Sequence, residues 1–136
     1  MRVVLDTNVI IAAFAARGLC AEIFEVCLAE DTIIISEHIL AEVQEKLTEK
    51  INLPDDTVKN IIEYLRDMAE LFEPEQVAKS ACRDKDDIKI IGTALRGNVD
   101  FIITGDNDLL ALKQYEEVKI ITPRQYWDFL RSKRSE

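Results

Sequence analysis

The chain has 136 residues, a net charge of −9 and an apolar content of 48%. This length suits one domain with one hydrophobic core, and the apolar content excludes a disordered protein. No apolar run approaches the ~20 residues that span a bilayer, so we expect no membrane partner. By itself, the acidic charge argues against nonspecific nucleic-acid binding, which usually requires a basic surface. We therefore expect a single folded domain over residues 1–136.

The cysteine and histidine content limits the chemistry further. The chain has three cysteines, Cys20, Cys27 and Cys82, and none of them forms a CxxC pair. An odd number of cysteines without such a pair is typical of reduced thiols in a cytoplasmic protein. The chain starts directly with a strand pattern, so we expect no signal peptide and a cytoplasmic location. His38 is the sole histidine, and no spacing of zinc ligands is present. We interpret His38 as an exposed helix residue and not as a catalyst.

The first half of the chain alternates between strand and helix patterns. Short runs rich in β-branched residues predict strands, apolar positions three and four apart predict helices, and Ser36 and Pro54 are suited to helix starts. In chain order we expect a strand at Arg2–Leu5, helices at Val9–Ala16 and Ala21–Glu30, a strand at Thr32–Ile35, a helix at Glu37–Lys50, a helix that Pro54 opens, and a short strand near Leu71–Glu73.

The second half repeats this alternation after a charged loop. A capping box in Thr122–Gln125, with proline at the first helical position, predicts the start of the last helix. The expected elements are a loop at Ser80–Asp86, a helix at Asp87–Arg96, a strand at Phe101–Ile103, a helix at Asn107–Lys113, a strand at Val118–Ile121 and this last helix. Such alternation predicts an α/β fold, a three-layer α/β/α sandwich with a mostly parallel central sheet.

Four acidic residues are expected at one edge of that sheet. Asp6 directly follows the first strand, and Asp106 follows the strand Phe101–Ile103. Glu42 lies ~9 Å along the helix after the second strand, and Asp87 lies in the first turn of its own helix. Helices begin at the carboxyl edge of parallel strands, so these carboxylates can converge there. Converging carboxylates repel one another unless they share a cation, and Mg²⁺ or Mn²⁺ prefers such oxygen ligands.

Each acid taken alone has another interpretation. Asp6 could cap the helix that follows it, and Glu42 could be a solvated helix residue. Asp87 lies in a run of acids, any of which could be a cap, and Asp106 and Asp108 could be turn residues. A shared metal site is the interpretation that accounts for all of them together.

Three motifs, in this order and spacing, resemble the PIN-domain family over essentially the whole chain. The motifs are Val3-Val4-Leu5-Asp6-Thr7-Asn8, Asp87-x-x-Ile90-x-x-x-Ala94 and Thr104-Gly105-Asp106-x-Asp108-Leu109, with Glu42 between the first two. The chain is most similar to the VapC-like toxin branch. The spacing to Ile90 and Ala94 selects Asp87, and not Asp86, as the third acid.

The resemblance implies a Mg²⁺- or Mn²⁺-dependent endoribonuclease, the toxin of a toxin–antitoxin pair. The metal ligands that it implies are Asp6, Glu42, Asp87 and Asp106, assisted by Asp108. Thr7 is implied to place a hydroxyl near the site, and Asn8 and Thr104 belong to the supporting motifs. Further implications are an RNA substrate, a homodimer and a small antitoxin protein as partner.

Other functions stay open at this point. The chain could be an RNA-processing nuclease without an antitoxin, or a non-catalytic scaffold that binds RNA or protein. A phosphotransfer domain is also α/β with an Asp at a strand end, but phosphatases of the haloacid type need a second Asp where this chain has Asn8. Because an acidic domain attracts RNA poorly, we expect a dimer to line a groove with its few basic residues. Candidates among the basic residues are Arg17, Lys85, Lys89 and Arg96.

Overall fold

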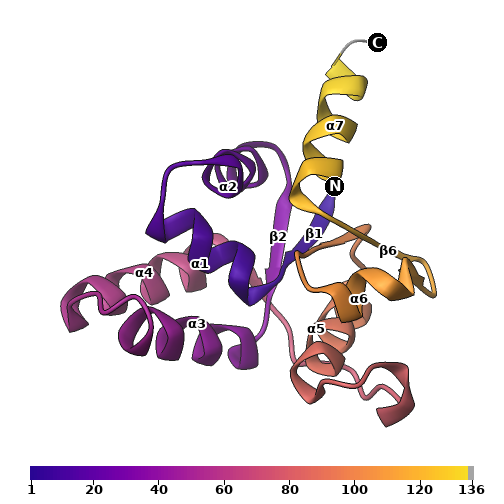
Figure 1. Cartoon of the computed structure of the whole chain (residues 1–136), viewed down its shortest axis with the longest axis horizontal. Coiled ribbons are helices and arrows are strands. Elements are labelled where there is room, and N and C mark those ends of the chain that lie inside the picture. The colour runs from indigo at the N-terminus through magenta and orange to yellow at the C-terminus, as the bar shows by residue number, and fades with distance from the viewer. Residues whose placement is uncertain (135–136) are drawn as a thin grey trace.

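The computed structural model of the protein describes residues 1–134, and the last two residues of the expected domain lie outside this range. Strands and helices alternate through most of the chain (Figure 1). The strands are β1 (Arg2–Leu5), β2 (Thr32–Ile35), β3 (Glu70–Leu71), β4 (Phe101–Ile103), β5 (Gln114–Tyr115) and β6 (Val118–Ile121). The helices are α1 (Thr7–Ala15), α2 (Leu19–Glu30), α3 (Glu37–Glu49), α4 (Asp55–Met68), α5 (Lys85–Arg96), α6 (Asn107–Leu112) and α7 (Pro123–Arg134), with a 3₁₀ turn η1 (Lys79–Ala81).

The strands form one sheet in the order β3-β2-β1-β4-β6-β5. All neighbouring strands are parallel except β5 and β6, which form an antiparallel hairpin. At the centre of the sheet Val4 pairs with Ile34 on one side and with Ile102 on the other. The carboxyl ends of β1, β2 and β4 are therefore aligned, which confirms the predicted α/β fold with a mostly parallel sheet.

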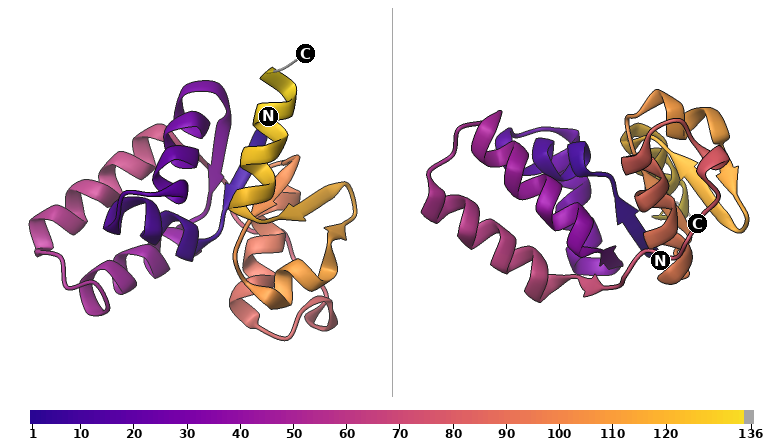
Figure 2. Two further views of the ribbon diagram at one scale, coloured as in Figure 1. Left: turned by 45° about the horizontal axis from the view of Figure 1, so that its top comes forward. Right: turned by 90° about the horizontal axis from the view of Figure 1, so that it is seen from below.

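Helices cover both faces of this sheet. Helix α5 packs on β1, β2 and β4, while α2 packs on β2 and contacts α1 and α7. Figure 2 shows α3 and α4 on the opposite side of β1 from α5. The three consecutive residues Val3, Val4 and Leu5 are each at most 1% exposed. Burial of consecutive residues requires cover on both faces, as expected for a parallel strand.

Several boundaries differ from those expected from the sequence. Helix α5 begins at Lys85, two residues earlier than expected, because the side chain of Asp84 caps it by accepting from the amide of Asp86. Part of the expected loop is the turn η1, and β3 lies at Glu70–Leu71 instead of Leu71–Glu73. Strand β5 was not expected; it is two residues long and joins β6 through a turn in which Glu116 has a φ of 51°.

The helix starts follow their sequence signals. Ser36 accepts from the amide of Ile39 at the start of α3, as expected of an N-cap. The capping box of α7 is present, with Thr122 and Gln125 each accepting from the amide of the other.

Within residues 1–134, no helix combines the length and the apolar character that crossing a membrane requires.

Candidate metal centre

A small pocket lies at the carboxyl edge of the central strands. Its volume is about 140 Å³, and acidic side chains dominate its lining. It is lined by Asp6, Thr7, Asn8, Glu42, Lys46, Asp84, Asp86, Asp87, Ile90 and Asp106. All four acids predicted as metal ligands thus line the same pocket, although they come from α3, α5 and the ends of two strands.

Asp6 is held at the end of β1 by both neighbouring segments. Its backbone amide donates to the carbonyl of Ile103 at 3.0 Å, which extends the pairing of β1 with β4. One carboxylate oxygen accepts from the amide of Thr7 at 2.7 Å, and the other accepts from the hydroxyl of Thr104 at 2.6 Å. Asp6 therefore caps α1 and also lines the acidic pocket, so its capping role is compatible with the predicted role as a metal ligand.

Asp106 and Asp108 are placed by the loop after β4. The amide of Asp106 donates to the hydroxyl of Thr104 at 2.9 Å. One of its carboxylate oxygens caps α6 by accepting from the amides of Asp108 and Leu109. Thr104 thus connects Asp106 to Asp6 through a single hydroxyl, which accepts from one segment and donates to the other.

Asp87 reaches the same edge from the first turn of α5. Its side chain is buried, and the thiol of Cys82 donates to it at 3.7 Å. Asp87, Asp106 and Asp108 offer one carboxylate oxygen each within 4.8 Å of one another. Such spacing brings three hard oxygen donors close enough to share one cation.

Burial and mutual repulsion disfavour the charged forms of these acids. Desolvation, followed by the charges of Asp106, Asp84 and Asp6, raises the pKa of Asp87 to about 7. Desolvation also raises the pKa of Asp6, against the hydrogen bonds from Thr104 and Thr7, and the charge of Asp106 adds to the increase. A divalent cation would relieve both effects, because it offers charge compensation where few positive side chains are present.

Glu42 approaches the pocket from α3. The hydroxyl of Thr7 donates to it at 3.2 Å, so the threonine that follows Asp6 links two of the predicted ligands. Desolvation and the charge of Asp86 raise the pKa of Glu42. Of the predicted supporting residues, Thr7 and Asn8 line the pocket, and Thr104 contacts it through its hydrogen bond to Asp6.

Sequence reasoning did not assign two residues, His38 and Lys46, to this edge. His38 was expected to be exposed, but its side chain is 30% exposed and its Nε2 lies 3.4 Å from Glu42 and 3.1 Å from Asp86. Lys46 donates to the side chain of Asn8 at 3.1 Å and lines the pocket. A signal was available, because His38, Glu42 and Lys46 are four residues apart and share one face of α3.

Comparison with known proteins agrees with this fold. The family model described as "PIN domain" matches residues 2–108. The chain belongs to the PIN domain family. No curated protein sequence matches it. Two similar solved structures are VapBC2 from Rickettsia felis bound to a DNA fragment from its promoter, and VapBC-1 from nontypeable Haemophilus influenzae.

Both likenesses cover most of the two chains compared. The Rickettsia chain has a TM-score of 0.61 at 17% identity, over 90% of this chain and 98% of that one. The Haemophilus chain has a TM-score of 0.64 at 20% identity, over 91% of this chain and 99% of that one. At this level of identity the likeness shows that this PIN domain shares their fold.

A basic groove lies next to the acidic pocket of this PIN domain. Its volume is about 650 Å³, and the cations in its lining are Lys79, Arg83, Lys85 and Lys89. Arg83 also approaches Asp108 at 3.5 Å, which places one wall of the groove beside the acidic site. Of the four basic residues expected to act together, Lys85 and Lys89 line this groove, whereas Arg17 and Arg96 are not part of its lining.

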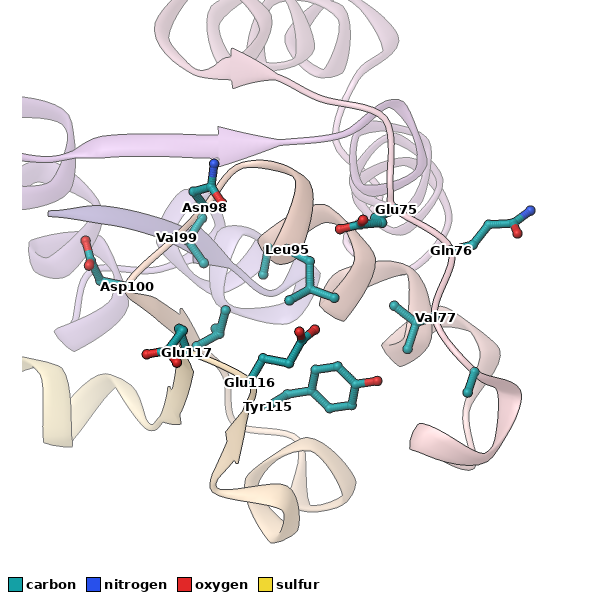
Figure 3. Close-up of a pocket in the computed structure, with 13 residues that line it drawn as sticks. Glu75, Gln76, Val77, Leu95, Asn98, Val99, Asp100, Tyr115, Glu116 and Glu117 are labelled. Carbon is teal, nitrogen blue, oxygen red and sulfur yellow. The ribbon is translucent and has the colours of Figure 1, made fainter.

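A separate hollow of about 570 Å³ lies at the opposite edge of the sheet (Figure 3). It is lined by residues that precede β4, such as Asn98 and Asp100, and by the turn at Glu116 and Glu117 before β6. No set of three metal-binding side chains meets there among residues 1–134. The small acidic pocket, and not this larger hollow, is therefore the candidate active site.

Proposed function

We propose that this PIN domain is a metal-dependent endoribonuclease and the toxin of a toxin–antitoxin pair. The observation that carries the proposal is the convergence of Asp6, Glu42, Asp87 and Asp106 on one pocket at the carboxyl edge of the sheet. Desolvation and neighbouring acids raise the pKa values of three of these carboxyls. Clustered carboxylates of this kind favour binding of a divalent ion, and divalent ions catalyse phosphodiester hydrolysis.

The donor set fits Mg²⁺ or Mn²⁺. Asp6, Glu42, Asp87 and Asp106 would bind metal in this pocket, with Asp108 assisting, and all of them offer carboxylate oxygens. A bound ion would supply a water of lowered pKa and would offset charge on the phosphate. The protein orients its own ligands for this purpose, because Thr104 fixes Asp6 and Thr7 fixes Glu42 through hydrogen bonds.

An RNA backbone is the polyanion that suits the surface beside this pocket. The chain carries a net charge of −9, yet four of its cations gather in the groove formed by Lys79, Arg83, Lys85 and Lys89. Phosphates of the strand would contact this groove while the phosphate to be cleaved lies at the acids. The groove supplies the local attraction that the acidic domain as a whole lacks.

The remaining interpretations are less well supported by the site. A haloacid-type phosphatase would need an acid where Asn8 accepts a hydrogen bond from Lys46. A non-catalytic scaffold would have no need to keep several buried or half-buried carboxyls together at a cost in stability. RNA maturation without an antitoxin would use the same site, and the cellular target distinguishes it from a toxin.

We further propose a single domain over residues 1–136, a cytoplasmic location, a homodimer and a small antitoxin partner. The two similar structures are of VapBC assemblies, which supports an antitoxin. Helix α4 exposes Tyr64 and Met68 one turn apart, and the adjacent edge strand β3 exposes Leu71. These apolar side chains offer a surface for a protein partner. Light scattering tests the dimer, because a monomer has a mass of 15.5 kDa.

The direct test is cleavage of RNA by the purified protein with Mn²⁺, beside the same protein with chelator and beside Asp6→Asn. We expect cleavage by the wild type with Mn²⁺ alone, and products with a 3′-hydroxyl and a 5′-phosphate. Equal cleavage by Asp6→Asn would mean that the pocket is not the site of the reaction.

A further inference from the structure

His38, Glu42 and Asp86 form a second group of possible metal ligands beside the first. One ligand atom from each lies within 4.8 Å of the other two, whereas the first group consists of Asp87, Asp106 and Asp108. His38 and Glu42 are one turn apart on α3, and Asp86 comes from the first turn of α5. The group thus bridges two helices that are far apart in sequence.

The two distances from His38 are close to those between neighbouring ligands of one cation. Nε2 of His38 lies 3.1 Å from an oxygen of Asp86 and 3.4 Å from an oxygen of Glu42. Two ligands at right angles around an ion with bonds of about 2.1 Å lie about 3 Å apart. The nitrogen and both oxygens could therefore bind one ion after small side-chain adjustments.

The His38 nitrogen has no hydrogen-bond partner among residues 1–134. The Nε2 atom is buried, and it makes no hydrogen bond although two carboxylates lie within 4 Å of it. A buried polar atom without a hydrogen bond is costly, so such atoms are rare. The lone pair of a neutral imidazole is a good ligand for transition ions, and coordination would satisfy this atom.

The surroundings leave room for further ligands. Asp86 is 57% exposed, so water or a phosphate oxygen can reach an ion from that side. Its amide is held by the Asp84 cap, which fixes the backbone of Asp86 at the start of α5. Glu42 is less exposed and is oriented by the hydroxyl of Thr7.

We propose that His38, Glu42 and Asp86 form a second cation site, which takes a transition ion such as Mn²⁺ in preference to Mg²⁺. The preference follows from the imidazole, which suits transition ions, whereas Mg²⁺ prefers oxygen ligands. The protein consequently binds more Mn²⁺ than Mg²⁺ ions. The site extends the acidic pocket toward α3 and holds its ion through a residue outside the set of predicted catalytic acids.

Pulsed electron paramagnetic resonance of bound Mn²⁺ tests this site without any measurement of activity. His38 is the sole histidine, so imidazole nitrogen coupling in an untagged protein has a single source. We expect this coupling in the wild type at saturating Mn²⁺, and we expect labelling with ¹⁵N-histidine to change it. We also expect the coupling to persist when Mg²⁺ competes for the group formed by Asp87, Asp106 and Asp108. Mn²⁺ without imidazole coupling would overturn the proposal.

Variants provide the matched comparison. His38→Gln should abolish the coupling, and Asp86→Asn should weaken binding of the nitrogen-coupled ion by at least about 10-fold. Asp108→Asn, which alters the other group, should leave the coupling in place. Coupling that survives in His38→Gln, or that disappears in Asp108→Asn alone, would place the ion elsewhere.

Discussion

The hydroxyl of Thr104 donates to the carboxylate of Asp6 at 2.6 Å, across 98 positions of sequence. The same hydroxyl accepts from the amide of Asp106 at 2.9 Å. One buried side chain thereby sets the relative position of two acids that line the small pocket. The parallel pairing of β1 with β4 makes this possible, because it aligns the two strand ends from which these residues emerge.

Thr104→Val should weaken both metal binding and folding. Valine keeps the shape but removes the donor to Asp6 and the acceptor of the Asp106 amide, a loss of about 1–3 kcal/mol in the free energy of unfolding. Mn²⁺ affinity should fall about 10- to 100-fold, as for other groups that orient a ligand. Urea unfolding and Mn²⁺ titration measure the two effects.

Thr93→Val is the matched control, because this buried hydroxyl donates to the carbonyl of Lys89 within its own helix. We expect it to leave Mn²⁺ affinity unchanged. Equal Mn²⁺ affinity in Thr104→Val and Thr93→Val would show that Thr104 does not orient the site.

Without metal, the protein should lose stability as the pH rises from about 4 to about 7. Burial and neighbouring acids raise the pKa of Asp87 to about 7 in the folded state, from 3.8 for the free side chain. Between these values the folded state binds more protons than the unfolded state, so the free energy of unfolding decreases with pH and then levels off. Asp87→Asn should flatten this dependence and raise stability at pH 8.

Urea unfolding at several pH values in the presence of a chelator measures this difference. Asp128→Asn, at an exposed position of α7, serves as control and should keep the wild-type pH profile. Parallel pH profiles for the wild type and Asp87→Asn would contradict the raised pKa assigned to Asp87.

Mn²⁺ should raise the melting temperature of the wild type. An ion that binds only the folded state stabilises it increasingly as its concentration exceeds the dissociation constant. The variant with both Asp6→Asn and Asp106→Asn should show a much smaller increase, and Asp128→Asn should show the full one. An equal shift in all three proteins would place the stabilising ion outside the pocket.

Charge reversal in the basic groove should weaken RNA binding. The variant with Lys85→Glu and Lys89→Glu removes two predicted phosphate contacts, so its affinity should fall and its salt dependence should become shallower. The comparison variant, with Lys59→Glu and Lys133→Glu, carries the same charge change at exposed positions of α4 and α7. Both are measured in the Asp106→Asn background to prevent cleavage. If RNA affinity depends on salt concentration identically in the two variants, the groove does not contact the RNA.

The sequence predicted the parts of this site that depend on local patterns. Asp6 and Asp106 could be assigned because each follows a short, continuously apolar run, the pattern of a strand buried on both faces. Asp87 and the capping box of α7 were equally accessible from helix signals. These predictions concern residues whose position depends on the element that carries them.

The parts that were missed depend on contacts between elements. No local pattern shows that α3 and α5 bring His38 close to Asp86, because that distance is set by how both helices pack around the sheet. Strand β5 was not predicted because it has only two residues and forms by pairing with β6. The early start of α5 depended on which of several neighbouring acids is the cap, and the structure selects Asp84.

The central claim is that the acids of the small pocket cleave RNA together with a metal. Single-turnover cleavage of one defined RNA with Mn²⁺ tests it most directly, across Asp6→Asn, Glu42→Gln, Asp87→Asn, Asp106→Asn and a control, Glu116→Gln, from the larger hollow. We predict that each of the four pocket variants loses at least about 100-fold in rate, whereas Glu116→Gln keeps the wild-type rate. Wild-type rates in the pocket variants, or a loss confined to Glu116→Gln, would contradict the claim.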